Sequence, residues 1–365
     1  MLVTFFTSLF VTFSASLFLI RYIHLHQKYT ADLHTQGPQK FHIGLTPRIG
    51  GIPILLGIFV GSALLTLQGV LPAQFGLFIL YAVAPVFLLG IAEDLSSRVS
   101  PFWRLLASFA SAALAGWLLG ATIPGIGIPG IDSLFAQQPW LPWLFTVVAV
   151  GGMCHSLNII DGYNGLASGV SGMILLALGY VCLEVGDRSL LAFSLVCSGA
   201  VAGFMIWNFP RGLIFAGDGG AYLLGFLIAE ISVLLVVRNP QVSPWFPFTL
   251  VVYPAWETLF SMYRRRVIRG QPTSLPDALH LHQMVFSRLV RWMVGRREAR
   301  HLLRRNSMTT PYLWGMGLLS VIPAILAWKY PLVLQLCCAI FVIFYLWLYR
   351  RLVRFRAPRW MVLRN

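Results

Sequence analysis

Charged residues are scarce in this chain of 365 residues: only 11% are Asp, Glu, Lys or Arg, whereas soluble domains have about 25%. Hydrophobic residues make up 58% of the chain. This composition excludes an ordinary soluble domain. Because apolar runs of about 18 residues or more recur along the chain, it predicts an all-α polytopic membrane protein. The runs do not resemble the alternating strands of a membrane β-barrel.

Cysteine is also scarce, and its placement argues against cross-links and zinc. All five cysteines lie in apolar runs, and no pair has CxxC spacing. Such thiols are typical of small buried side chains.

The apolar runs predict a single domain over residues 1–365 with a bundle of about eleven transmembrane helices. The first span, Leu2–Ile20, is followed and not preceded by basic residues, so we expect a retained helix with its N-terminus outside. The C-terminus then lies in the cytoplasm. The other spans are expected at 49–68, 75–92, 102–123, 140–157, 166–183, 190–207, 220–237, 246–263, 311–328 and 332–349.

Basic residues give the chain a net charge of +15. Nearly all of them fall on the side assigned to the cytoplasm, as the positive-inside rule requires. Because they flank spans and do not form one basic and aromatic groove, we expect no nucleic-acid partner. The basic loop 264–310 is expected to contain an amphipathic helix, and with the basic tail 350–365 it is expected to contact anionic membrane lipids.

Acidic residues are the rarest charged type, with twelve in all. Glu93, Asp94, Asp161 and Asp218 are expected at the inner ends of helices, at one membrane depth. Carboxylates gathered in one layer repel each other unless a cation or a basic substrate group lies among them. Mg²⁺ typically binds one or two carboxylates together with phosphate oxygens and water. We therefore predict a Mg²⁺ site there, with Mn²⁺ as the alternative.

The most informative stretch is NIIDGYNGLASG, Asn158–Gly169. A polar turn between two helices explains Gly162 and Gly165. It does not explain why Asp161 and Asn164 share a helical face at i, i+3. We therefore interpret the stretch as part of a binding site.

A second such stretch is WNFPRGLIFAGDGGAYLLGF, Trp207–Phe226. Aromatic residues at a membrane boundary explain Trp207 and Phe209, but not the glycines around Asp218. Phe215 is well placed to stack on a flat ring.

Two basic segments complete the pattern. The loop His34–Pro53 contains Lys40 and leads into a glycine pair; anion binding at a helix N-terminus and an ordinary positive-inside loop explain it equally well. In the second segment, His280 and His282 follow a run of arginines, and this combination is typical of diphosphate ligands.

In this order the motifs TPRIGG, the acidic pair at 93–94, NIIDGYNGL, WNFP with FAGDGG, and the histidine loop resemble the polyprenyl-phosphate N-acetylhexosamine-1-phosphate transferases. This family also contains the phospho-MurNAc-pentapeptide translocases. The resemblance covers essentially the whole chain. It implies a Mg²⁺-dependent active site on the cytoplasmic face of the bacterial inner membrane. The implied reaction transfers a sugar-1-phosphate from a UDP-N-acetylhexosamine to undecaprenyl phosphate and releases UMP.

The resemblance also implies a role for each motif residue. Asp218 is the expected principal metal ligand, with Asp94, and the expected catalytic residues are Glu93, Asp94 and Asp161. Residues expected to line the nucleotide site are Asn158, Gly162, Asn164, Asn208 and Phe215, the last stacking on uracil. Residues expected to hold the phosphates are Lys40, His280, His282, Arg264 and Arg265.

Three positions depart from the family pattern. Glu93 stands where the acidic pair has Asp, Asn164 where DGxDGL has an acid, and Gln283 where a further histidine is usual. The incomplete histidine triplet favours the branch that starts O-antigen, capsule or other surface polysaccharides over the pentapeptide translocases. The alternative from another class is a transporter in which Glu230 and Glu257 carry a proton or a cation.

Several points stay open at this stage. The donor is expected to be UDP-GlcNAc, with UDP-GalNAc or a deoxy sugar next. Direct attack by the lipid phosphate is our first hypothesis, and a covalent route through Asp94 or Asp161 is the alternative. The oligomeric state is undetermined, with a homodimer among the arrangements allowed.

Overall fold

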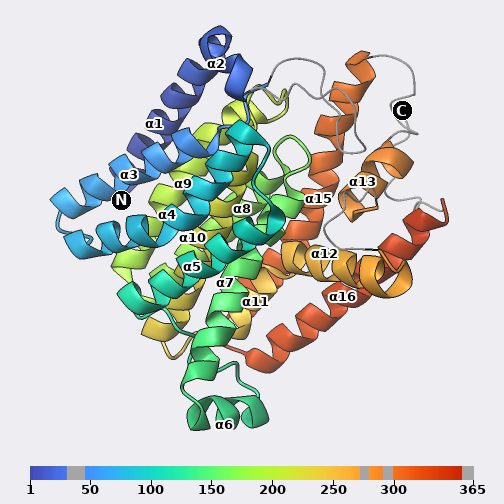
Figure 1. Ribbon diagram of the computed structural model, residues 1–365. Helices are drawn as coiled ribbons and strands as arrows, with labels where there is room; N and C mark the ends of the chain where they lie inside the picture. The colour runs from blue at the N-terminus through green and yellow to red at the C-terminus, as the bar shows by residue number, and fades with distance from the viewer. Residues whose placement is uncertain (31–45, 272–278, 291–298, 356–365) are drawn as a thin grey trace.

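The computed structural model describes residues 1–30, 46–271, 279–290 and 299–355 (Figure 1). In these ranges it consists of helices without a sheet, which confirms the predicted all-α class. Nine of the described helices are long and apolar enough to cross a membrane. They are α1 (Leu2–Arg21), α4 (Ala73–Ser96), α5 (Pro101–Leu119), α7 (Trp140–Ile160), α8 (Leu166–Val185), α9 (Arg188–Asn208), α10 (Gly217–Arg238), the Leu303–Ala327 part of α15 (Ala299–Ala327) and α16 (Pro331–Val353).

The remaining elements are shorter. The apolar helix α3 (Gly51–Leu67) covers most of the predicted span 49–68 but has only 17 residues. The others are α2 (Ile23–Thr30), α6 (Pro129–Gln137), α11 (Trp245–Leu250), α12 (Val252–Tyr263), α13 (Leu281–Met284) and two π-helical turns, η1 (Arg264–Ile268) and η2 (Val285–Val290).

The predicted span 246–263 is not one helix: α11 ends and α12 begins on either side of Val251. Pro254 explains the break, because proline has no N–H to donate to the carbonyl four residues earlier. That carbonyl, of Leu250, accepts instead from the Ser320 hydroxyl of α15 at 3.4 Å. In Figure 1, α12 runs across the direction of α15.

The described part of the basic loop 264–310 is not a simple surface helix, because some of its apolar side chains are buried in the protein. In η2, Phe286, Leu289 and Val290 are buried, and η2 contacts α15 and α16. Exposed apolar side chains lie instead on the α12–η1 segment, where Val267 and Ile268 are about two-thirds exposed. Residues 291–298 and the end of the basic tail, 356–365, lie outside the described residues, so the predicted amphipathic helix stays a prediction.

Helix α10 is the centre of the bundle, and it is buried along almost its whole length. It packs against α7, α4, α3 and α8, and Figure 1 shows it behind α4 and α5. Since its N-terminus contains the FAGDGG motif, the neighbours of that N-terminus determine what surrounds Asp218.

Glycines allow three helices to meet at the start of α10. Gly217 has φ +72°, and a Cβ there would lie 1.9 Å from the Arg48 carbonyl oxygen. A Cβ on Gly51 of α3 would lie 2.5 Å from the Gly220 nitrogen, and one on Gly90 of α4 would lie 2.6 Å from the Gly219 Cα. The glycines of TPRIGG and FAGDGG therefore bring backbones of different helices into direct contact.

This contact gives a stability prediction. Gly51→Ala places a methyl group against the α10 backbone, which has no flexible side chain to move aside, and overpacking of this kind typically costs about 1–3 kcal/mol. We expect a lower midpoint of thermal unfolding in detergent. The matched control is Gly76→Ala in α4, where a Cβ would meet nothing within 4 Å. Equal midpoints for the two variants would show that the contact of α3 with α10 is not close-packed.

Candidate active site

The carboxylate of Asp94, near the end of α4, caps the N-terminus of α10. Its two oxygens accept the backbone N–H groups of Asp218 at 2.8 Å and Gly219 at 2.9 Å. The first N–H groups of a helix have no partner inside the helix, and a negative charge is favourable next to them. The Asp94 side chain is fully buried. Asp94, a predicted site residue, therefore also fixes the position of Asp218, another predicted site residue.

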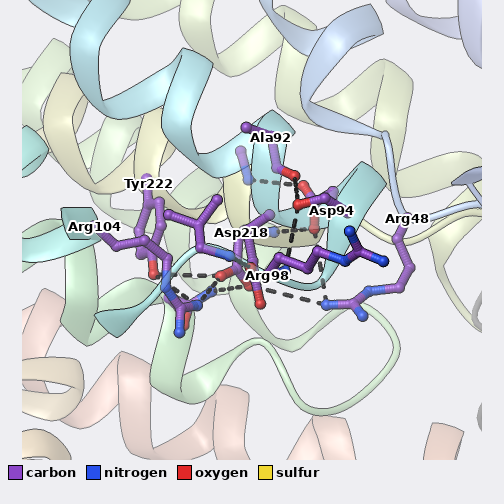
Figure 2. Close-up of polar contacts among 12 residues, drawn as sticks. Arg48, Ala92, Asp94, Arg98, Arg104, Asp218 and Tyr222 are labelled. Atoms are coloured by element: carbon purple, nitrogen blue, oxygen red, sulfur yellow. Dashed lines mark hydrogen bonds and ion pairs between the residues drawn. The ribbon is translucent and has the colours of Figure 1, made fainter. Parts of the chain in front are cut away.

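Asp218, in the first turn of α10, has partners on two other helices and one on α10 itself. The Asn158 amide of α7 donates to Asp218 Oδ1 at 3.0 Å. Arg104 of α5 donates to Oδ2 and forms an ion pair with it. The Tyr222 hydroxyl, one turn along α10, donates to Oδ2 at 3.4 Å. Figure 2 shows Asp218 at the middle of this network.

Two arginines lie on opposite sides of Asp218 in Figure 2. Arg48 Nη2 lies 3.8 Å from Asp94 Oδ1 and 3.9 Å from Asp218 Oδ1, and Arg104 contacts the other oxygen of Asp218. Neither arginine was assigned to the site from the sequence. Their positions in the sequence could have indicated them, since Arg48 belongs to the motif TPRIGG and Arg104 follows the acidic pair on the next helix.

Asp161 directly follows α7 and is a third carboxylate of this centre. Burial raises the pKa of Asp161 well above its ordinary value, and the charges of Asp218 and Asp94 raise it further, while Arg48 lowers it. These charges influence Asp161 because all of them lie close together. The structure thus brings Asp94 and Asp218 together, and the pKa of Asp161 responds to the charges of both.

Glu93 does not join them. Its Oε2 accepts the backbone N–H of Val99 at 2.7 Å, in the turn between α4 and α5. Adjacent residues of an α-helix point about 100° apart, so Asp94 faces α10 while Glu93 faces the turn. The catalytic role expected for Glu93 stays a prediction, and the structure gives its side chain a place beside the centre.

Asn164 and Asn208 lie deeper, and both are buried. The Asn164 amide donates to the Pro210 carbonyl, and the Asn208 side chain accepts from the Gly165 N–H and donates to the Ile214 carbonyl. Their side chains therefore hold the two polar stretches, 158–169 and 207–217, against each other.

The segment around Phe215 runs beside TPRIGG. The Phe215 N–H donates to the Pro47 carbonyl, and the Gly50 N–H donates to the Phe215 carbonyl, both at 2.9 Å. Phe215 itself is partly exposed, as a ring that stacks on a base must be. Lys40 lies outside the described residues, so its expected phosphate contact stays a prediction.

The histidine loop reaches the same region. The rings of His280 and His282 stack with 5.1 Å between centroids and 5° between planes. A Cβ on Gly162 would lie 3.4 Å from His282 Nε2, and the Tyr163 ring contacts the His282 ring at 5.4 Å. His282 therefore contacts the loop that begins with Asp161.

Glu257 of α12 holds this loop through contacts with His280 and Leu281. Its Oε1 lies 3.0 Å from His280 Nδ1 and accepts the Leu281 N–H at 3.1 Å, and its Oε2 accepts the Tyr345 hydroxyl at 2.8 Å. The carboxylate is buried and its neighbours are all donors. Glu257, weighed above as a transporter residue, is thus an anchor for one of the predicted site histidines.

Arg264 and Arg265 are both buried at the end of α12. Arg264 Nη1 donates to the Leu279 carbonyl at 2.7 Å and to the Tyr349 hydroxyl of α16 at 2.8 Å. The structure therefore shows Arg264 holding the start of the histidine loop against α16. The expected phosphate contacts of both arginines stay predictions.

The donors present at the centre suit a hard divalent cation. Asp94, Asp161, Asp218 and Asn158 offer oxygen atoms, and each carboxylate oxygen can accept more than one contact. Within the described ranges no group of three or more His, Cys, Asp or Glu side chains is placed to hold a metal ion by itself. Mg²⁺ and Mn²⁺ take one or two protein carboxylates and complete their coordination with phosphate and water, and the predicted cation stays a prediction.

Several known proteins have sequences similar to this chain. Residues 76–236 match the model of glycosyl transferase family 4. A Bacillus subtilis protein described as a probable undecaprenyl-phosphate N-acetylglucosaminyl 1-phosphate transferase is 29% identical over 256 residues, 68% of each chain. A Thermotoga maritima undecaprenyl-phosphate alpha-N-acetylglucosaminyl 1-phosphate transferase is 29% identical over 277 residues, 76% of this chain and 80% of that one.

A third relative represents the other branch considered above. It is a phospho-N-acetylmuramoyl-pentapeptide-transferase of Moorella thermoacetica, 28% identical over 211 residues, 54% of this chain and 64% of that one. The sequence matches, the all-α membrane fold and the polar centre at the helix ends lead to one conclusion. The chain belongs to the polyprenyl-phosphate N-acetylhexosamine-1-phosphate transferase family and is a membrane-bound glycosyl-1-phosphate transferase.

Proposed function

We propose that this protein transfers N-acetylglucosamine-1-phosphate from UDP-GlcNAc to undecaprenyl phosphate, releases UMP, and so starts the synthesis of a lipid-linked surface polysaccharide such as O-antigen or capsule. The observation that carries the proposal is the pair Asp94 and Asp218, connected through the N-terminus of α10 and flanked by Arg48 and Arg104. Carboxylates for a cation and arginines for phosphate oxygens are what a diphosphate substrate requires.

The choice of sugar rests on the relatives, two of which are named for N-acetylglucosamine. The histidine loop supports this branch over the pentapeptide translocases. Gln283, where a further histidine is usual, is engaged within the protein, since its Oε1 accepts the His280 N–H at 3.1 Å. It therefore caps the short helix α13.

The reaction we propose is a direct displacement. An oxygen of the lipid phosphate attacks the β-phosphorus of UDP-GlcNAc, the bond from that phosphorus to the bridging oxygen breaks, and UMP leaves. Arg48 and Arg104 would orient phosphate oxygens and stabilise their charge, so that catalysis is mainly positioning and electrostatics. Mg²⁺, held by Asp218 and Asp94, would neutralise part of the phosphate charge when bound.

The geometry of Asp94 favours this direct route over a covalent one. Its carboxylate already accepts two backbone N–H groups of α10. Attack through one of these oxygens would uncap the helix, and the buried N–H groups would lose their partner. Asp161 stays the alternative nucleophile, and a trapped covalent sugar-phosphate enzyme in the absence of lipid would identify it.

We also propose that the centre faces the cytoplasm at the bacterial inner membrane. The C-terminal ends of α4 and α7 and the N-terminal end of α10 lie at the centre. The arginine-rich η1 connects to the same region through Arg264 and the histidine loop. The excess of arginine at this end is the positive-inside pattern.

Product analysis tests the proposed function. Purified protein in detergent is incubated with undecaprenyl phosphate and each of UDP-GlcNAc, UDP-GalNAc, a UDP-linked deoxy-N-acetylhexosamine and UDP-MurNAc-pentapeptide, and the lipid product is identified by mass spectrometry. We expect a mass increase of one N-acetylhexosamine-phosphate with UDP-GlcNAc, together with UMP. A product formed only from the MurNAc-pentapeptide donor would replace the proposal with the other branch of the family.

Asp218→Asn keeps the shape of the side chain but removes the charge that would bind the cation. We expect turnover to fall by about two orders of magnitude or more, with no large change in the unfolding midpoint. Removal of Mg²⁺ with EDTA should abolish wild-type turnover, and added Mg²⁺ should restore it. Asp132→Asn, in the short helix α6 outside the centre, is the control. Normal turnover in Asp218→Asn would mean that the cation site is assigned to the wrong residue.

Glu257→Gln tests the support of the histidine loop. The amide no longer supplies a charged acceptor to both His280 and the Leu281 N–H, so we expect kcat/KM to fall about tenfold, as is typical when a group that orients an active-site histidine is changed. The matched control is Glu230→Gln in α10, since the Glu230 carboxyl is also fully buried but has no hydrogen-bond partner in the described part of the chain. Equal kinetics for both variants would count against an active-site role of the histidine loop.

A further inference from the structure

Asn164 is held from three directions at once. Its backbone N–H donates to Asn306 Oδ1 at 2.9 Å, its carbonyl accepts the Thr310 hydroxyl at 2.7 Å, and its side-chain Nδ2 donates to the Pro210 carbonyl at 2.9 Å. The residue is 1% exposed. Few residues of a loop are fixed through both backbone groups and the side chain by separate elements.

One face of α15 provides most of these contacts. Asn306, Thr310 and Trp314 are spaced four residues apart, so they lie above one another on the same side of the helix. Trp314 Nε1 donates to the Gly165 carbonyl at 3.0 Å. A Cβ on Gly169 would lie 2.2 Å from that same nitrogen, so the indole packs directly on the start of α8. These three side chains of α15 therefore lie along the loop and along the start of the helix after it.

The stretch 208–214 closes the loop from the other side. Asn208 Oδ1 accepts the Gly165 N–H at 2.6 Å, and Asn208 Nδ2 donates to the Ile214 carbonyl at 2.8 Å. Gly212 has φ +63°, and a Cβ there would lie 2.6 Å from Asn164 Oδ1. Asn164 is therefore enclosed between this turn and α15.

In the described part of the chain the hydrogen-bond partners of Asn164 are neutral, its Oδ1 has none, and the Pro210 carbonyl accepts from its Nδ2. A carboxylate at position 164 has no N–H to give, and it would be buried against a carbonyl oxygen without a cation. The family pattern has an acid at this position. In this chain the amide is therefore a required donor and not a weakened form of a metal ligand.

We propose that Asn164, Asn306 and Thr310 form a neutral clamp that positions the loop carrying Asn158 and Asp161 against Asp218. The inference rests on the proposed function and deepens it: these three are positioning residues and contact neither the nucleotide nor the cation. This replaces the nucleotide contact that the resemblance implied for Asn164. The clamp acts through the chain that precedes Asn164, because Asp161 and Asn158 lie three and six positions before that residue.

The clamp predicts a difference between two substitutions of one residue. Thr310→Ser keeps the hydroxyl that donates to the Asn164 carbonyl, whereas Thr310→Val keeps the shape and loses the donor. We expect Thr310→Val to lower kcat/KM for UDP-GlcNAc about tenfold and to leave the KM for undecaprenyl phosphate unchanged, while Thr310→Ser stays near wild type. A general loss of folding would change both KM values and the unfolding midpoint. Equal kinetics of the two variants would overturn the clamp.

Asn164→Asp restores the acid of the family pattern and separates the clamp from a ligand role. The clamp predicts a loss of about tenfold or more, with no change in the Mg²⁺ concentration that gives half-maximal activity. Activity at or above wild type, or a lower Mg²⁺ requirement, would show that position 164 serves the cation and would overturn the proposal.

A measurement that needs no turnover keeps the two proposals apart. Hydrogen exchange of residues 158–169 is compared between wild type, Thr310→Ser and Thr310→Val in the same detergent. We expect faster exchange in Thr310→Val only. Unchanged exchange would refute the clamp even in an active enzyme. Absence of sugar-phosphate transfer by the wild type would refute the proposed function and leave the exchange result to decide the clamp.

Discussion

The active centre depends on one interaction, the carboxylate of Asp94 on the first N–H groups of α10. At a helix N-terminus inside a membrane protein, water does not reach these groups, and leaving them unpaired is costly. Asp94 can reach them only if the backbones of α4 and α10 touch, which the contact of Gly90 with Gly219 allows. Capping, close packing and the position of Asp218 are therefore consequences of the same contact.

The two carboxylates brought together by this contact, Asp94 and Asp218, need positive charge, and the protein supplies part of it. Arg48 and Arg104 approach Asp94 and Asp218 from segments on either side. Guanidinium groups suit this position because their planar donors match both carboxylate and phosphate oxygens. Three acids and two arginines leave a net negative charge only if Asp161 is ionised, and burial raises the pKa of Asp161. A bound cation would favour the ionised form of these carboxylates.

Much of this could be predicted from the sequence, for a physical reason. Apolar runs of fixed length set the depth of every helix end, so acids at those ends were expected in one layer, and Asp94 does lie against the first turn of α10, which contains Asp218. The break in the span 246–263 was also visible in principle, since Pro254 is in the sequence. What depth does not determine is rotation about a helix axis, and for this reason the side chain of Glu93 faces a turn.

Contacts between segments that are distant in the sequence could not be predicted for the same reason. Nothing near Glu257 in the sequence indicates that its carboxylate accepts from His280 and Tyr345. Likewise, Asn164 and Asn306 are 142 residues apart, and an asparagine in a helix is usually a surface residue. Such pairs depend on how helices pack, and periodicity within one helix carries no information about its partner.

The few acids of this chain divide by the kind of partner they have. Several accept backbone N–H groups: Asp94 and Glu257 at the starts of α10 and α13, Asp187 at the start of α9, and Glu93 and Asp132 in turns. Partners of that kind cannot leave without moving a helix or a turn. Asp218 differs, because in the described part of the chain its carboxylate contacts only side chains, those of Arg48, Arg104, Asn158 and Tyr222.

Side chains can rotate away when a cation or a phosphate arrives, whereas a backbone cap cannot. An acid whose partners are all side chains is therefore the one whose oxygens can change ligands during a reaction. The same distinction explains why the proposed clamp around Asn164 is neutral: its task is to stay fixed, and hydrogen bonds between amides, hydroxyls and carbonyls do not attract the cation or the charged substrate. The partners of the Asp218 carboxylate can be exchanged for a cation, while backbone contacts that cannot be exchanged fix the position of the residue. This is the physical basis for proposing Asp218 as the cation ligand.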